Sequence, residues 1–203
     1  MEIKKLAHNA LNFSINRFIE ILGISIFVIG TLLLVSLLSF SPEDPNFIFP
    51  DNTKIKNLLG YQGSFIADIF FQSFGLISVL IPFSLMLTGL NIFLNKKIFL
   101  IVESIFFTVL YLLLGSLFFS FFYTNAFELY TNGNGGFIGK YLKSTFLNSL
   151  IEINSLASYY LLLLFVLIFF LISIKFKIDS FYKFVKKIFR PVSYTHLRAH
   201  ETR

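Results

Sequence analysis

Long apolar stretches alternate with short polar ones along this 203-residue chain, and four of the stretches are long enough to cross a membrane. A spanning helix needs about 20 predominantly apolar residues. The sequence therefore predicts spans at residues 21–40, 71–94, 98–122 and 156–174. The predicted fold class is an all-helical membrane protein, with one four-helix domain over residues 21–174.

The second predicted span contains Gly75, Pro82 and Gly89 at intervals of seven residues. Glycine and proline are tolerated inside membrane helices because neighbouring helices can satisfy the backbone groups that they free. An interval of seven places the three residues near one face, where small side chains allow a neighbouring backbone to approach closely. We expect this face to pack against another helix and Leu85 to face lipid.

The segment before the first span, residues 1–20, places Ile3, Leu6, Ala10 and Phe13 three or four residues apart. This spacing predicts a cytoplasmic helix that lies at the membrane interface. A cleaved signal peptide is the alternative. Its apolar region would measure about 7 to 15 residues, however, and the run at 21–40 is longer.

A second amphipathic segment lies between the third and fourth spans. From residue 137 to 153, apolar residues recur every four positions and include Ile138, Leu142 and Phe146. This pattern predicts a helix that lies on the outer membrane surface, in the second outer loop. Two roles remain open for the predicted helix: it covers the bundle, or it docks a partner helix through these three residues.

Basic residues are distributed unevenly between the predicted loops. Eleven Lys and Arg lie before the first span, between the second and third, or at residues 175–190, whereas the other side carries Lys54, Lys56, Lys140 and Lys143. Loop Lys and Arg are enriched on the cytoplasmic side of membrane proteins. Both termini are therefore predicted to be cytoplasmic, and the basic juxtamembrane segment 175–191 is expected to contact anionic lipid.

Composition supports a membrane protein, because 56% of the residues are hydrophobic and 14% are charged, against about 25% charged in soluble domains. The chain contains no cysteine, which excludes disulfides and thiolate metal sites. The predicted spans also contain no histidine. These absences disfavour a membrane-embedded enzyme.

Glu103 is the ionisable residue that clearly lies inside a predicted span, where a charge is costly. It lies about two helical turns from Lys97, so it can reach the interface or pair with Lys96 or Lys97. This anchoring role is preferred over a proton relay. A transporter would be expected to carry several charges around a midplane site, so a small transporter or channel subunit is kept as the alternative function.

Several residues occur in the order and spacing of a known membrane domain. In the first outer segment and the second span they are Asp44, Pro45, Asn57, Gly60, Gly63, Ala67, Asp68, Gly75, Pro82 and Gly89, and in the second outer loop they are Gly135, Gly136 and Gly139. Over residues 15–190 this pattern resembles the N-terminal four-helix (4TM) domain of the FtsK/SpoIIIE DNA translocases.

The resemblance implies a multi-pass anchor in the bacterial inner membrane at the division septum, acting in cell division and chromosome segregation. It also implies a homo-oligomer that contacts the lipid bilayer and division-site membrane proteins, tethered to an ATP-driven motor that moves double-stranded DNA. No G-x-x-x-x-G-K-[ST] phosphate loop occurs in the 203 residues. We therefore expect that this chain is not an enzyme and that it has no catalytic, cofactor-binding or metal-binding residues. ATP, Mg²⁺ and DNA would bind to the motor.

The last twelve residues, 192–203, resemble the translation of a transposon-type sequencing adapter. We treat this segment as an artefact and expect the natural sequence to differ after about Pro191. His196, His200 and Glu201 have the spacing of part of a helical zinc site. Because they lie in the suspect segment, they support no metal prediction.

Overall fold

The structure, a computed structural model, describes residues 2–45, 54–124 and 132–176, with side chains from residue 8 onward in these ranges. The elements are α1 (Glu2–Leu38), α2 (Gly60–Phe74), the 3₁₀ helix η1 (Gly75–Val79), α3 (Leu80–Asn95), α4 (Leu100–Phe122), α5 (Gly136–Lys143), α6 (Leu147–Ile153) and α7 (Ser155–Ser173). Four helical stretches are long and apolar enough to cross a membrane: His8–Leu38, Gly60–Asn95, Leu100–Phe122 and Ser155–Ser173. The predicted all-helical class with four spans is confirmed.

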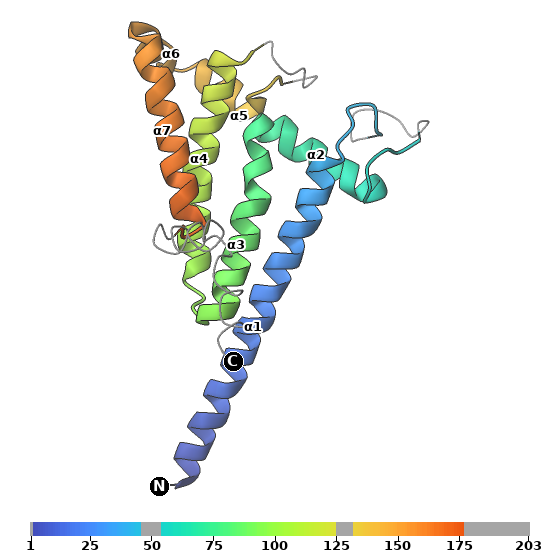
Figure 1. Cartoon of the computed structure of the whole chain (residues 1–203), viewed down its shortest axis with the longest axis vertical. Coiled ribbons are helices and arrows are strands. Elements are labelled where there is room, and N and C mark those ends of the chain that lie inside the picture. Colours follow the sequence, from blue (N-terminus) through green and yellow to red (C-terminus); the bar gives the residue numbers. More distant parts are fainter. Residues whose placement is uncertain (1, 46–53, 125–131, 177–203) are drawn as a thin grey trace, which may run out of the picture.

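The membrane helices form an open row (Figure 1). Helix α1 packs along α3, helix α4 packs along α7, and α3 joins the two pairs through its contact with α4. Within the described part of the chain, α1 approaches neither α4 nor α7 to a Cα–Cα distance of 8 Å. The four spans therefore do not close around one central axis, and each pair is a distinct packing unit.

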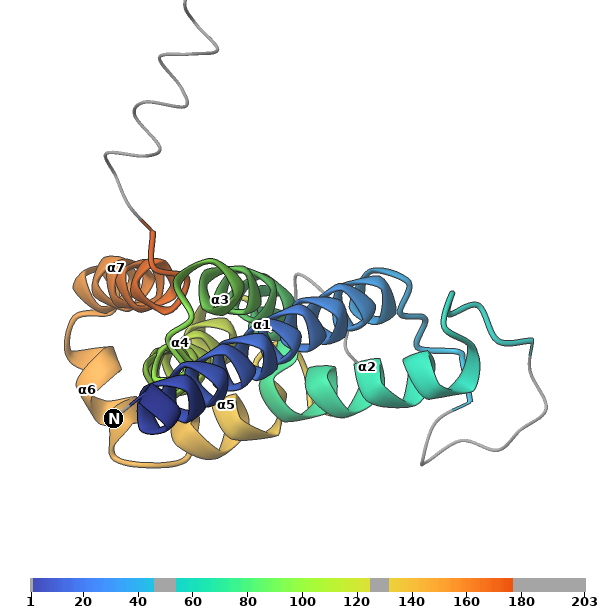
Figure 2. The ribbon, with the colours of Figure 1, turned by 90° about the horizontal axis from the view of Figure 1, so that it is seen from below.

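The second span differs from the prediction, because its first residues belong to another helix. The chain bends at Gly75, whose φ of 73° and ψ of −151° lie in a region that essentially only glycine adopts. Before this bend, α2 lies across one end of the row (Figure 2). Together η1 and α3 measure about 34 Å, which is enough to cross a membrane. The predicted span at 71–94 therefore includes the last turn of α2, and its boundary at residue 71 remains a prediction.

Helix α1 is continuous over 37 residues, or about 56 Å. It is longer than a hydrocarbon core of about 30 Å, and its N-terminal part extends beyond the other helices (Figure 1). No helix break occurs near residue 20, where the interfacial helix was expected to end. The location of residues 1–20 at the membrane interface remains a prediction.

The predicted amphipathic helix at 137–153 is two short helices, α5 and α6, and the continuous helix is wrong. Between them, the Ser144 hydroxyl donates to the Tyr141 carbonyl at 2.7 Å and the Thr145 hydroxyl donates to the Leu142 carbonyl at 2.6 Å. Such side-chain bonds to nearby backbone compete with helix continuation. Helix α5 lies beside α2 across the same end of the row (Figure 2).

We call the end that carries α2, α5 and α6 the loop end, and the opposite end, which carries Lys96, Lys97 and Lys175, the basic end. The larger core cluster lies toward the loop end and centres on Ala67 and Tyr111, both fully buried. The loop end is thus where the short helices cover the spans.

Candidate functional site

The buried carboxylate of Asp44 organises the chain between α1 and α2. Its side chain is 1% exposed, and its two oxygens accept the backbone N–H groups of Lys56 at 2.7 Å and Asn57 at 2.8 Å. The neighbouring Pro45 carbonyl accepts the Ser64 hydroxyl at 3.2 Å. Hydrogen bonds to an ionised acceptor are stronger than neutral ones. Asp44 therefore fixes the segment that leads into α2.

The Asn57 side chain continues this network to α1. Its amide donates to the Ser36 carbonyl at 2.8 Å, and its amide oxygen accepts the Leu59 N–H at 3.0 Å. The Ser36 hydroxyl donates to the Gly63 carbonyl at 2.6 Å. A Cβ atom on Gly63 would lie 2.1 Å from the Asn57 amide oxygen, so a larger residue there would displace the Asn57 side chain from its hydrogen bonds. We call Ser36, Asp44, Asn57, Gly63 and Ser64 the Asp44 network.

The remaining residues of the first motif lie on α2. Gly60 starts the helix with a φ of 65° and donates its N–H to the Asn57 carbonyl at 2.9 Å. Ala67 and Asp68 are 0% and 6% exposed and lie on the buried face of α2 together with Gly63. This face packs against the rest of the domain.

An ion pair on the surface flanks the Asp44 network. The Lys56 ammonium contacts the Glu43 carboxylate, and both side chains are well exposed. The hydrogen bond from Lys56 lowers the pKa of Glu43, and the same bond raises the pKa of Lys56. Each shift favours the charged form at neutral pH, so this pair is suited to a structural contact rather than to proton transfer.

Four glycines converge where η1, α4 and α5 meet. They are Gly75, Gly135, Gly136 and Gly139, which we call the glycine crossing. A Cβ atom on Gly139 would lie 2.2 Å from the Ser116 carbonyl oxygen, and one on Gly75 would lie 2.0 Å from the Asn134 carbonyl oxygen. Both obstacles are backbone atoms, so larger residues cannot be accommodated without moving a helix.

Hydrogen bonds hold the same crossing together. The Leu76 N–H donates to the Asn134 carbonyl at 2.9 Å, and the Ser116 hydroxyl of α4 donates to the Phe74 carbonyl at 2.8 Å. The Asn132 amide donates to the Gln72 carbonyl at 3.2 Å. The loop before α5 is thus tied to the bend between α2 and α3.

The predicted shared face of Gly75, Pro82 and Gly89 is wrong, because the three residues make different contacts. Gly75 belongs to the glycine crossing, and Pro82 is buried in the first turn of α3, where its missing N–H is tolerated. Gly89 faces α1: a Cβ atom there would lie 2.6 Å from the Gly23 carbonyl oxygen. Of the three, Gly89 has the helix-packing role that was expected.

Two glycines of α1, Gly23 and Gly30, escaped the sequence analysis. A Cβ on Gly23 would lie 2.8 Å from the Gly89 carbonyl oxygen, and one on Gly30 would meet the Met86 backbone nitrogen at 2.9 Å. The two glycines are seven residues apart, and this interval was the signal in the sequence that could have identified them. Leu85 is half-buried against the same face, so its predicted lipid exposure is also wrong.

A set of hydroxyl groups links α3, α4 and α7. The Thr88 and Ser104 hydroxyls are 2.6 Å apart, and the Ser173 hydroxyl lies 2.9 Å from that of Thr108. The Ser84 hydroxyl lies 3.0 Å from that of the fully buried Tyr111. Hydroxyls that bond across membrane helices stabilise their association.

The family model for the 4TM region of DNA translocase FtsK/SpoIIIE matches residues 16–188. The chain belongs to this family. It is 29% identical over 82 residues to the DNA translocase FtsK of Rickettsia prowazekii (strain Madrid E), and 33% identical over 88 residues to that of Azospirillum brasilense. These alignments cover 39% and 42% of this chain. No solved structure matches.

The aligned regions make up 11% of the Rickettsia prowazekii protein and 14% of the Azospirillum brasilense protein, so the chain spans a small part of these relatives' length. It is a membrane region of the FtsK/SpoIIIE type. The residues that carried the resemblance gather at its loop end, in the Asp44 network, on the buried face of α2 and in the glycine crossing. Pro82 and Gly89 are the exceptions, because Pro82 lies in the first turn of α3 and Gly89 lies at the α1–α3 contact.

Three ion pairs in the described part of this FtsK-type domain lie at the basic end. Glu103 pairs with Lys175, so the expected partners Lys96 and Lys97 are wrong. Lys96 instead lies 2.8 Å from Glu20, which also binds Arg17. Glu103 is in the first turn of α4, where a negative charge is favourable. This position and this ion pair fit the predicted role of Glu103, which is to anchor the end of α4 at the membrane interface.

The predicted interaction residues Ile138, Leu142 and Phe146 do not form one face. Leu142 packs against a buried cluster and Ile138 is half-buried, whereas Phe146 is 74% exposed. The exposed aromatic surface of α5 is formed by Phe137 and Tyr141, whose rings stack at 6.4 Å. The break at residues 144–146 explains the difference, because it turns Phe146 out of register with α5.

Among the residues that the structure describes, no group of three or more His, Asp or Glu side chains could hold a metal ion. His196, His200 and Glu201 lie outside the described residues, as does the basic segment beyond residue 176. The described geometry is that of close backbone contacts and buried hydrogen bonds, which position helices.

Proposed function

We propose that this domain is the membrane anchor of a DNA translocase and that both of its termini are cytoplasmic. The observation that carries the proposal is the family match over residues 16–188. Orientation is supported by Arg17, Lys96, Lys97 and Lys175, which lie toward one end of the row. The described spans α3, α4 and α7 carry charge only near this end, which favours an anchor over the alternative transporter.

Alkaline phosphatase fusions test the orientation. A fusion after Lys56 should be active outside the cytoplasm, and a fusion after Lys97 or Arg190 should be inactive. Activity after Lys97 would contradict the proposed topology.

The anchor role includes location in the inner membrane at the division septum, contact with division-site membrane proteins and homo-oligomer formation. Double-stranded DNA, ATP and Mg²⁺ would bind a motor joined to this domain, as the name of the relatives suggests. The surface that we propose for division proteins is the stacked pair Phe137 and Tyr141 on α5, because it is apolar, exposed and rigidly held by the glycine crossing. It replaces the surface expected from the sequence.

A fluorescent fusion of residues 1–190 in a closely related rod-shaped host tests this location. The unmutated fusion should concentrate at the septum, and the double substitution Phe137→Ser with Tyr141→Ser should spread along the membrane. The control is Phe106→Ser, which alters an equally exposed aromatic residue on α4. Uniform fluorescence of the unmutated fusion would contradict septal location, and unchanged recruitment of the double variant would contradict the surface.

A further inference from the structure

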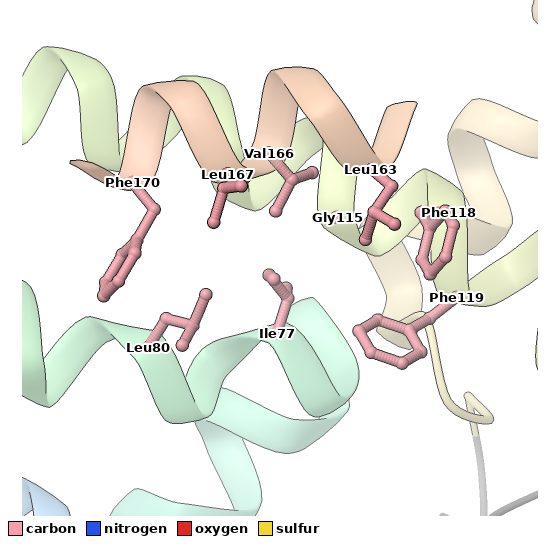
Figure 3. Close-up of a pocket in the computed structure, with 9 residues that line it drawn as sticks. All are labelled: Ile77, Leu80, Gly115, Phe118, Phe119, Leu163, Val166, Leu167 and Phe170. Atoms are coloured by element: carbon pink, nitrogen blue, oxygen red, sulfur yellow. The ribbon is translucent and has the colours of Figure 1, made fainter. Parts of the chain in front are cut away.

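Two cavities border the loop end of α4 and share one wall. The first has a volume of about 340 Å³ and is lined by Lys140, Lys143 and Asn134, among others. The second has a volume of about 320 Å³ and lies between η1, α3, α4 and α7 (Figure 3). Phe119 lines both. The two cavities therefore adjoin at Phe119, one with polar and basic residues in its lining and the other with an apolar lining.

Among the described residues that line the polar cavity, two are basic and none is acidic. Within the described residues, neither Lys140 nor Lys143 pairs with a carboxylate. The Lys143 ammonium donates to the Ser120 carbonyl at 3.1 Å and lies 4.9 Å from the Phe121 ring centroid, and neither group carries a negative charge. Two ammonium groups in one cavity favour an anion with several oxygen acceptors, such as a phosphate.

Asn134 adds a second requirement for a ligand of the polar cavity. It is 2% exposed, and its amide oxygen has no hydrogen-bond partner in the described part of the chain, although its amide nitrogen donates to the Tyr123 carbonyl. Buried polar atoms are nearly always hydrogen-bonded. An amide oxygen accepts only, so the missing partner must be a donor. The ligand therefore combines an anion with a hydroxyl or N–H group.

The apolar cavity is lined by apolar side chains and Gly115. Dry apolar cavities bind apolar molecules rather than water. Leu163 and Leu167 project into the cavity from α7 (Figure 3). They are also 45% and 52% exposed, so the α7 side of the cavity borders the surface that would face lipid. At membrane depth, the available apolar occupant is a hydrocarbon chain.

We propose that the two cavities form one binding site for an anionic glycerophospholipid whose headgroup carries a free hydroxyl. The phosphate binds between Lys140 and Lys143, the headgroup hydroxyl donates to Asn134, and an acyl chain occupies the apolar cavity beyond Phe119. Phosphatidylglycerol has this chemistry. The proposal requires that the domain lies in a membrane, and it depends neither on orientation nor on the proposed anchor function.

The first experiment tests the polar part of the site by measuring which lipids remain bound to the protein. The whole chain is placed in nanodiscs containing equal amounts of phosphatidylglycerol, phosphatidic acid and phosphatidylcholine, released into detergent, and examined by native mass spectrometry. Phosphatidylglycerol should be retained about tenfold more than phosphatidylcholine, because the choline group carries a positive charge that the two lysines repel and has no hydroxyl to donate to Asn134. Its retention should also exceed that of phosphatidic acid, whose headgroup has no hydroxyl beyond the phosphate. Equal retention of all three lipids would overturn the proposal.

The variant Lys140→Gln with Lys143→Gln should lose the preference for phosphatidylglycerol. Lys54→Gln is the matched control, because Lys54 is exposed and does not line the cavity. Loss of preference in both variants would indicate a general charge effect and contradict the site. Circular dichroism melting of each variant separates lost binding from lost folding.

The apolar part is tested from the lipid side. Leu167→Trp should fill the cavity and reduce phosphatidylglycerol retention, whereas Leu164→Trp, on an exposed position of α7 outside the lining, should not. Water-soluble glycerol 1-phosphate serves as a competitor. If it displaces phosphatidylglycerol at equal concentration, the acyl chain contributes nothing and the lipid assignment is overturned.

Discussion

The two helix pairs of the row are held together by different contacts. Between α1 and α3, Gly23, Gly30 and Gly89 bring the two backbones into direct contact. Between α4 and α7, aromatic rings and hydroxyl groups fill the space. The ring centroids of Phe118 and Tyr159 are 5.2 Å apart, and those of Tyr111 and Phe170 are 5.7 Å apart. The hydroxyls of Thr108 and Ser173 form a hydrogen bond. One pair depends on the absence of side chains and the other on their presence.

This difference predicts how each pair responds to substitution. Lipid tails are as apolar as leucine, so membrane helices associate through packing and hydrogen bonds. A glycine contact tolerates no added atom, because its neighbours are backbone atoms that cannot rotate away. In a contact built from side chains, each truncation removes one of several interactions and leaves the others in place. Enlargement should therefore disrupt the α1–α3 pair abruptly, and truncation should weaken the α4–α7 pair gradually.

The largest effect is expected for Gly89→Leu. A Cβ there would already lie 2.6 Å from the Gly23 carbonyl oxygen and from the Phe27 nitrogen, so α1 must separate from α3. We expect a loss of about 3 kcal/mol or more of stability, at the upper end for overpacking. Thermal melting in detergent measures it, with Leu90→Phe as the control on the exposed side of α3. Equal melting of both variants would show that the backbones are not in contact.

A smaller effect is expected for Phe118→Ala on the α4–α7 side. Phe118 is 5% exposed and its ring lies within 5.6 Å of four other aromatic rings. Replacing a buried phenylalanine by alanine costs a water-soluble protein about 3–5 kcal/mol of stability. In a membrane the hydrophobic contribution to this cost is absent, because lipid tails are as apolar as the protein interior. We therefore expect a loss of about 2 kcal/mol from lost packing. Phe106→Ala, on the exposed side of α4, is the control. A loss as large as that for Gly89→Leu would erase the distinction between the pairs.

The sequence predicted the number of spans because their length and apolar composition are set by the bilayer. It did not predict which spans pair. Helices that are apolar on every side carry no amphipathic pattern to mark the buried face. The glycine interval in 71–94 gave a partial indication: Gly89 does pack against a helix, but Gly75 lies at a bend.

The elements at the loop end were harder to predict for a physical reason. The apolar run at 71–94 continues across Gly75, and only the backbone angles of that glycine show that α2 ends there. Helix α2 does carry a pattern of its own, since Gly63, Ala67 and Phe71 are four residues apart and all buried. The partners of Asp44 depend on a chain reversal that hydropathy does not reveal.

Ser173→Ala should have an effect of about 1 kcal/mol or less, the range found for hydrogen bonds between membrane helices. The Ser173 hydroxyl is fully buried and connects α7 to Thr108 and Ser104 of α4. Thr31→Ala is the matched control, because the Thr31 hydroxyl bonds the Phe27 carbonyl of its own helix. The difference between the two melting shifts isolates the interhelical part. No difference would mean that the Ser173 hydroxyl contributes nothing to the contact between α4 and α7.

The smallest effects should come from the basic end, where each pair has one ion pair. Glu20 links α1 to Lys96 and also binds Arg17, with its side chain 13% exposed, whereas Glu103 links α4 to Lys175 and is 46% exposed. Exposed ion pairs contribute little and are screened by salt. We therefore expect Glu103→Gln to lower the melting temperature only slightly, and the change to vanish in 1 M salt. Glu20→Gln should lower it more and keep part of the effect in salt, because two cations lose their partner. The reverse order would indicate that the basic end holds α4 and α7 together more strongly than α1 and α3.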